Sequence, residues 1–258
     1  SSVDELVWGH VVVDVGANSA ATIVIDHAGS ATYGAMLSVL VGDGARLTMV
    51  SLQDWDDDAV HVEHQAASVG RDASFTSAVV TLGGDLVRLT PTVHYTGPGG
   101  SAELLGLYFA DAGQHLEHRL FVDHDQPHCR SRVTYKGALQ GKSAHTVWIG
   151  DVLIRAEAIG TDTYEENRNL LLTDGARADS VPNLEIETGE VQGAGHASTT
   201  GRFDDEQLFY LMARGIPETE ARRLVVRGFF AEIVDRIGVP EVRDRLLAAV
   251  ERELGDAG

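Results

Sequence analysis

Cysteine is almost absent from the sequence, with Cys129 as the single one among 258 residues. One thiol cannot form an internal disulfide, which argues against a disulfide-stabilised secreted domain and favours a reducing compartment. Taken by itself, Cys129 is interpreted as a small hydrophobic residue of the core, which is how most unpaired cysteines behave.

Basic residues and long apolar runs are also scarce. Lys and Arg number 20 against 39 Asp and Glu, which gives a net charge of −19 and a pI of about 4.8. A chain this acidic repels phosphate backbones, so no nucleic acid is expected as a partner. No apolar run approaches the roughly 18 residues of a membrane span, and no charged-then-apolar leader opens the sequence. The sequence therefore predicts a cytoplasmic protein without membrane contact.

Aromatic residues make up only 6% of the chain, whereas hydrophobic residues in all make up 43% and glycine occurs 28 times. This composition predicts a core of Val, Leu, Ile and Ala with many tight backbone positions. The length allows one large all-β domain or two smaller domains.

Residues 1–201 are predicted to form a domain of short strands. Apolar runs of strand length alternate with glycine-rich turn signals. Glycine and small residues recur before strands at an irregular spacing of roughly 30 to 55 residues, which is no fixed solenoid period. An antiparallel sandwich and a coil of parallel strands, a β-helix, both fit the pattern, and the scarcity of two-residue hairpin signals favours the β-helix. The expected strands include 11–13, 21–25, 36–41, 47–50, 78–82, 87–89 and 93–95.

Residues 202–258 are predicted to be a helical segment. A cap at Asp204 or Asp205 begins a helix that runs through Met212. Pro217 suits the first turn of a second helix, and a third follows it.

The second and third helices each carry an apolar stripe. These stripes can pack on the strands, on one another or on a partner protein, and the sequence leaves all three open. The expected stripes are Val225, Phe229, Ile233 and Ile237 in the second helix, and Val242, Leu246, Val250 and Leu254 in the third.

The eleven histidines invite a metal-binding interpretation that their spacing does not support. His61 and His64 are three apart, as are His115 and His118, and an odd offset places two strand side chains on opposite faces. A β-helix can still gather ligands from successive turns. A metal-dependent enzyme that uses His115, His118 and His128 therefore stays as an alternative function, although no nucleophile or phosphate-loop motif supports an enzyme.

His196 lies where the strand pattern gives way to the helical one, in a run of small residues from Gly193 to Thr199. Small neighbours let another chain or a ligand approach the imidazole, which is a good ligand for iron or zinc. A lone histidine cannot hold a metal ion or a cluster, because four protein ligands are usual. Either a second chain supplies the other ligands, or His196 is simply hydrogen-bonded in a turn.

Several segments are typical of one family. They are Asp125-Gln-Pro-His-Cys-Arg-Ser-Arg132, Asn167-Arg-Asn-Leu-Leu-Leu-Thr-Asp174, Pro182-Asn-Leu-Glu-Ile186, Gly195-His-Ala-Ser-Thr199 and Leu208-Phe-Tyr-Leu-Met-Ala-Arg-Gly-Ile-Pro217. On these residues the sequence resembles the SufB/SufD family of iron–sulfur cluster assembly proteins, and most of all its SufD branch.

The resemblance implies a right-handed parallel β-helix core followed by a helical segment. It implies a scaffold subunit, not an enzyme, that pairs with a SufB-like subunit through the β-helix cores. His196 matches a histidine that the SufD-type subunit contributes at that interface, where a nascent iron–sulfur cluster is shared. No cofactor or metal is expected to stay bound to this chain alone. Many relatives carry a cysteine where this sequence has Gly193, and a helical region ahead of the core, which this sequence is expected to lack.

The resemblance also implies that the helical segment binds a SufC-like ATPase. Without its SufB-like partner, the core is expected to pair with a second copy through the same surface. A structural module that pairs with itself through a bare end rung is the remaining alternative. The residues expected to dock the ATPase are Leu208, Phe209, Tyr210, Arg214, Pro217, Arg222 and Arg227, and the secondary site candidates are Cys129 and His128.

Overall fold

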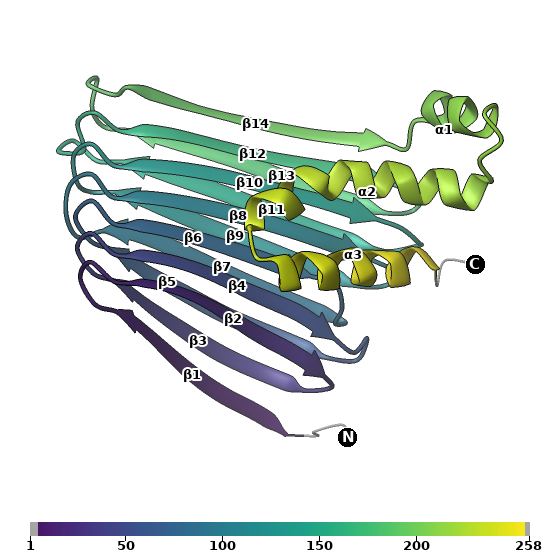
Figure 1. Ribbon diagram of the computed structural model, residues 1–258, viewed down its shortest axis with the longest axis horizontal. Coiled ribbons are helices and arrows are strands. Elements are labelled where there is room, and N and C mark those ends of the chain that lie inside the picture. The colour runs from purple at the N-terminus through teal and green to yellow at the C-terminus, as the bar shows by residue number, and fades with distance from the viewer. Residues whose placement is uncertain (1–4, 256–258) are drawn as a thin grey trace.

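The computed structural model describes residues 5–255 as fourteen strands followed by three helices (Figure 1). The odd-numbered strands form one seven-stranded sheet and the even-numbered strands form the other, and the paired strands are parallel. The chain alternates between the sheets, so two successive strands make one coil of a parallel β-solenoid. The predicted β-helix is confirmed, and the sandwich is excluded. The strands are β1 (Leu6–Val15), β2 (Ala20–Gly29), β3 (Thr32–Val41), β4 (Arg46–Trp55), β5 (Val60–Val69), β6 (Ser74–Thr81), β7 (Leu86–Tyr95), β8 (Ser101–Ala110), β9 (His115–His124), β10 (Arg130–Leu139), β11 (His145–Ile154), β12 (Asp162–Leu171), β13 (Arg177–Ile186) and β14 (Gly193–Arg202).

The repeat of the solenoid is shorter than the spacing of the glycine segments indicated. One coil takes between 26 residues, from Leu6 to its register partner Thr32, and 32 residues, from His145 to Arg177. The turns absorb this difference in length, because most strands are ten residues long. The strands also run longer than the apolar runs: 87–89 and 93–95 are two ends of the single strand β7.

A largely hydrophobic core fills the space between the two sheets. Strand side chains alternate between the two faces, so every second residue of each strand points inward. In β5 the buried positions alternate with exposed or half-buried ones along the whole strand. The inward positions are mostly aliphatic, as the composition predicted, with a few large rings such as Trp148 and Tyr95.

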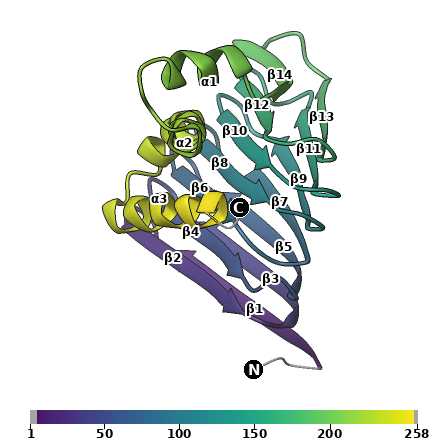
Figure 2. The ribbon, with the colours of Figure 1, turned by 90° about the vertical axis from the view of Figure 1, so that its right-hand side faces the viewer.

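A second core lies outside the solenoid, under α2 (Glu218–Ile237) and α3 (Pro240–Gly255). Both helices cover the outer face of the even-numbered sheet (Figure 2). Strands β8 and β10 are consequently buried on both faces. Lys136 of β10 fixes α2, because its ammonium group donates to the Phe229 carbonyl at 3.0 Å and lies 2.8 Å from the Glu232 carboxylate. Of the three options left open, two are observed together, because the helices pack on the strands and on one another.

The helix boundaries agree with the sequence, and one stripe needs correction. The first helix, α1 (Asp205–Met212), ends at Met212 as predicted. Pro217 is the N-cap of α2 and not a residue of its first turn. The buried face of α2 is rotated from the predicted stripe, so Val225 and Phe229 are only half-buried. The buried residues are Ala221, Val226, Phe230, Ile233, Val234 and Ile237 in α2, and Leu246, Ala249 and Val250 in α3; the predicted Val242 and Leu254 have side chains outside the described ones.

None of the helices between residues 5 and 255 has the length and apolarity that a membrane crossing requires.

Candidate functional site

The last coil of the solenoid, β13 and β14, leaves its inward-facing side chains uncovered. Within the described residues, β14 pairs only with β12 and β13 only with β11 (Figure 1). Side chains that would be buried one coil earlier are therefore exposed here. His196, Ser198 and Thr200 follow one another at every second position of β14 and form an exposed polar row.

His196 lies directly beside Glu165 of β12, its register partner in the neighbouring strand. The Nδ1 atom of His196 is 3.8 Å from Oε1 of Glu165. The imidazole is 43% exposed, whereas the Glu165 side chain is 1% exposed. The open end of the solenoid thus presents a histidine at its surface with a carboxyl group beneath it.

The Glu165 carboxyl group is held in a non-ionised state at neutral pH. Burial raises its pKa to about 8, the charge of Asp151 adds to this effect, and the backbone of Asn183 offsets only part of it. Neither carboxyl oxygen finds a hydrogen-bond partner of normal geometry among residues 5–255. A buried polar group without a partner is costly, so this carboxyl group is poised to accept a donor or a cation.

The space for the carboxyl group comes from Gly150 of β11. A Cβ atom on Gly150 would lie 2.4 Å from Oε2 of Glu165 and equally close to the ring of Trp148. Any larger residue would therefore displace one of the two. Trp148 is buried, and its indole N–H has no partner among the described residues. An imidazole and a carboxyl group therefore meet at the open end, and the ring of Trp148 lies beneath them next to Gly150.

A chain of hydrogen bonds holds the two strands of the last coil together. Ser198 donates to the Ser180 hydroxyl at 2.8 Å, and Ser180 donates to Oδ1 of the Asn167 side chain at 2.7 Å. These bonds join β14 to β13 and to the coil below. The polar row next to His196 is thus supported by side chains of the coil below.

Glu165 was not predicted as a site residue, because its position beside His196 follows only from the length of the coil repeat. Glu165 and His196 are 31 residues apart, which is one coil in register. Without the repeat, Glu165 is one of 39 acidic residues with no distinguishing neighbour. The repeat also explains why three predicted histidines do not form a metal site.

His115 and His118 lie on opposite faces of β9, as their odd spacing predicted. His118 is buried, where its Nε2 contacts the Thr81 hydroxyl at 3.0 Å, and His115 is half-buried outside, 3.2 Å from the His145 ring nitrogen. His128 lies in the turn after β9 and is exposed. The structure therefore does not bring together the three histidines of the proposed metal-dependent enzyme.

Cys129 is fully buried, as predicted, beside His128. Its thiol lies 3.6 Å from the carbonyl oxygens of Gly97 and Pro127. Burial raises the pKa of the thiol to about 11, so it is protonated at neutral pH. Metal ligation requires a thiolate, which makes Cys129 a poor ligand where it lies.

The residues predicted to dock a partner lie on α1, on the connection that follows it and on the first half of α2, but Leu208 does not share the exposure of the others. Leu208 is buried, whereas Phe209 is 74% and Tyr210 56% exposed. Arg214 stacks on the Tyr210 ring at 4.5 Å, and Arg222 stacks on the Phe203 ring at 4.9 Å. Pro217 and Arg227 are exposed.

A groove runs beside these residues. One part, of about 380 Å³, lies between α1 and α2, and a second part, of about 460 Å³, continues along α2 toward the end of β14. The first part is lined by Asp204, Glu206, Tyr210, Leu211 and Val225. Exposed aromatic side chains next to a groove are typical of a protein-binding surface.

The fold and the site together define a parallel β-solenoid whose last coil is open at a histidine. Residues 1–229 match the family model described as SUF system FeS cluster assembly, SufBD core domain. An iron–sulfur cluster assembly SufBD family protein of Mycobacterium bovis is 63% identical over 253 residues. The SufD proteins of Escherichia coli and Bacillus subtilis are each 28% identical, over 221 and 258 residues. The chain therefore belongs to the SufBD family, as the resemblance indicated.

The matched regions cover most of this chain but only part of each relative. They span 96% of this chain and 64% of the Mycobacterium bovis protein. They span 86% and 97% of this chain, but 52% and 58% of the Escherichia coli and Bacillus subtilis proteins.

Proposed function

We propose that this chain is a non-catalytic scaffold subunit for iron–sulfur cluster assembly, and that its last coil provides His196 to a cluster site shared with a second chain. The observation that carries the proposal is the pairing of exposed His196 with buried Glu165 at the open end of the solenoid. Neither side chain can hold a cluster alone, and together they supply at most two ligands. The remaining ligands come from the partner, so no cluster stays bound to the isolated chain.

The partner at the open end is a SufB-like subunit. Within residues 5–255 the outer edge of β14 has no strand partner, and such an edge favours association with another strand edge. Ile186 of β13, six residues after Ser180 and therefore on the same inward face, is 45% exposed and supplies apolar surface at the open end. The iron of the nascent cluster is then bound by His196 from this chain and by a thiolate from that partner. In the absence of the partner, a second copy of this chain pairs through the same edge.

The partner at α1 and α2 is a SufC-like ATPase. Phe209 and Tyr210 project from α1, and the groove between α1 and α2 accepts side chains of the ATPase. Helix α1 is directly connected to the strand that carries His196, because only residues 203 and 204 separate β14 from α1. ATP-driven movement of the ATPase therefore pulls on the strand that carries His196 and opens or tightens the shared site. The complex acts in the cytoplasm.

The test is His196→Ala in the complete protein, expressed in cells with its SUF partners. The complex is expected to assemble and to carry less cluster, measured as iron and acid-labile sulfide per purified complex. His128→Ala is the matched control, since it removes an exposed histidine away from the last coil. Normal cluster content in His196→Ala removes this histidine from the mechanism. A complex that does not assemble identifies a structural role at the interface instead.

A further inference from the structure

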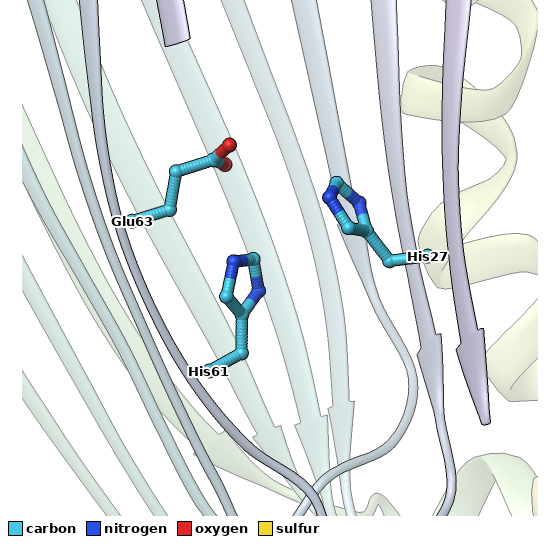
Figure 3. Close-up of side chains that lie close together, drawn as sticks. All are labelled: His27, His61 and Glu63. Carbon is cyan, nitrogen blue, oxygen red and sulfur yellow. The ribbon is translucent and has the colours of Figure 1, made fainter. Parts of the chain in front are cut away.

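A second group of potential ligands lies inside the first three coils, far along the solenoid from His196. His27 of β2 faces His61 and Glu63 of β5 across the interior (Figure 3). One donor atom from each of the three lies within 4.8 Å of the others. His61 and Glu63 share the inward face of β5 because they are two residues apart, and His27 comes from the opposite sheet.

The hydrogen bonds around His61 define which ring nitrogen is available. Nδ1 of His61 lies 2.8 Å from Oε1 of Gln53, and the Trp55 indole donates to the same oxygen at 2.8 Å. The Trp55 indole N–H also lies 3.2 Å from Nδ1, but it is closer to the Gln53 oxygen. Because a carbonyl oxygen can only accept and makes the shorter contact with His61, we assign the proton to Nδ1 and the lone pair to Nε2. Nε2 is buried and has no hydrogen-bond partner among the described residues. An imidazole oriented by a bond at one nitrogen and open at the other is typical of a metal ligand.

Glu63 places a buried carboxyl group in this space with little to compensate a charge on it. It is 4% exposed, and the side-chain hydrogen bond that it receives comes from Gln65 at 2.7 Å. A buried carboxylate without a paired charge is costly. A divalent cation would compensate that charge and use the lone pairs of the two imidazoles.

We propose that His27, His61 and Glu63 bind one divalent first-row transition-metal ion, zinc or iron(II), with a water molecule in an open position. Two imidazoles and one carboxylate are a common ligand set for both ions. Bond lengths of about 2.0 to 2.2 Å require the donor atoms to approach to roughly 3.4 Å, which small side-chain rotations supply. The ion ties the first coil to the third and stabilises this end of the solenoid. This departs from the expectation of a chain without metal, and it does not depend on the proposed cluster site.

The test uses Co²⁺ as a spectroscopic probe on the full-length protein after removal of metals with a chelator. We expect one equivalent of Co²⁺ to give visible absorption of a low-coordinate site, and Zn²⁺ to displace it and raise the melting temperature. Glu63→Gln and His27→Gln are expected to weaken binding by on the order of 100-fold. Glu63→Gln keeps the shape of the side chain, and half-buried His27 offers a second variant if the first does not fold.

Two control variants distinguish this site from others. His64→Gln changes an exposed histidine on the outward face of the same strand and is expected to bind Co²⁺ like the unmodified protein. His196→Ala is expected to bind equally well, so a failure of the cluster proposal leaves this result unchanged. Absence of stoichiometric Co²⁺ and Zn²⁺ binding, or binding that persists in folded Glu63→Gln and His27→Gln, overturns the proposal.

Discussion

The imidazole of His196 lies 3.8 Å from the carboxyl group of Glu165, and the two residues are direct register partners in adjacent parallel strands. One is exposed and the other is buried, so a ligand that reaches His196 from outside meets Glu165 next. This arrangement joins an imidazole to a carboxyl group that ionises only when something compensates its charge.

Glu165 contributes a pH dependence to the stability of the protein. Its folded pKa of about 8 lies above the value of 4.5 expected in the unfolded chain. Between these values the folded state holds a proton that the unfolded state has lost. Stability due to Glu165 is therefore complete below about pH 4.5, falls by up to about 1.4 kcal/mol per pH unit as pH rises, and is lost above about pH 8.

Glu165→Gln is expected to remove this dependence. The neutral amide resembles the protonated carboxyl group, so the variant gains stability relative to the unmodified protein as pH rises from 5 to 9. Urea unfolding across that range measures the difference. Glu166→Gln is the control, because the Glu166 side chain pairs with Arg168 outside the solenoid. A stability difference that stays constant with pH would mean that Glu165 is ionised in the folded protein.

Gly137 and Gly106 are each covered by a tyrosine from the neighbouring strand. Gly137 pairs in register with Tyr108, and Gly106 pairs with Tyr135, so each ring lies over the other strand's glycine. A Cβ on Gly137 would come within 1.9 Å of the Tyr108 ring. That ring cannot move freely, because its hydroxyl donates to Asn169 at 2.6 Å.

Gly137→Ala is consequently expected to destabilise the protein by about 1 to 3 kcal/mol, the usual effect of overpacking a core. Chemical unfolding followed by circular dichroism measures it. Gly201→Ala is the matched control, since a Cβ at Gly201 in β14 meets no atom of the described residues within 4 Å. Equal stability of the two variants would contradict the close packing of Tyr108 on Gly137.

The sequence predicted local features well and features that depend on the repeat poorly. The end of α1 at Met212 and the all-strand character before it follow from local capping and period, which a sequence displays directly. The coil length does not, because turns of different length hide it. Glu165 and Gly150 meet only when that length is known. The buried face of α2 also depends on how the helix lies on the sheet. For this reason Phe230 is buried, whereas the helical period alone predicted Phe229.

Phe230 anchors α2 on the even-numbered sheet. Its ring is 1% exposed and belongs to the core shared by α2, α3 and the sheet. Phe230→Ala is expected to cost about 3 to 5 kcal/mol through lost burial and the cavity that remains. Denaturant unfolding measures the loss. Phe229→Ala, at the neighbouring half-buried position, is expected to cost less stability. A larger loss in Phe229→Ala than in Phe230→Ala would mean that Phe229, and not Phe230, faces the sheet.

Phe209 is expected to affect binding without affecting the fold. Its side chain is 74% exposed on α1, beside the groove lined by Tyr210 and Val225. Phe209→Ala therefore removes almost no buried area and changes stability by less than about 0.5 kcal/mol. If this surface docks the ATPase, loss of an aromatic anchor costs about 2 kcal/mol of binding energy, a roughly 30-fold weaker complex.

Titration of the purified ATPase against the full-length protein by calorimetry measures this difference. Phe121→Ala provides the control, because Phe121 is 36% exposed on β9 in the other sheet, away from the helical layer. Binding should be unchanged in Phe121→Ala and weakened in Phe209→Ala at equal melting temperature. Equal affinity of both variants would exclude the α1 surface, and the ATPase would then have to bind elsewhere on the chain. Because α1 follows β14 directly, such a result would also remove the proposed route from nucleotide hydrolysis to His196.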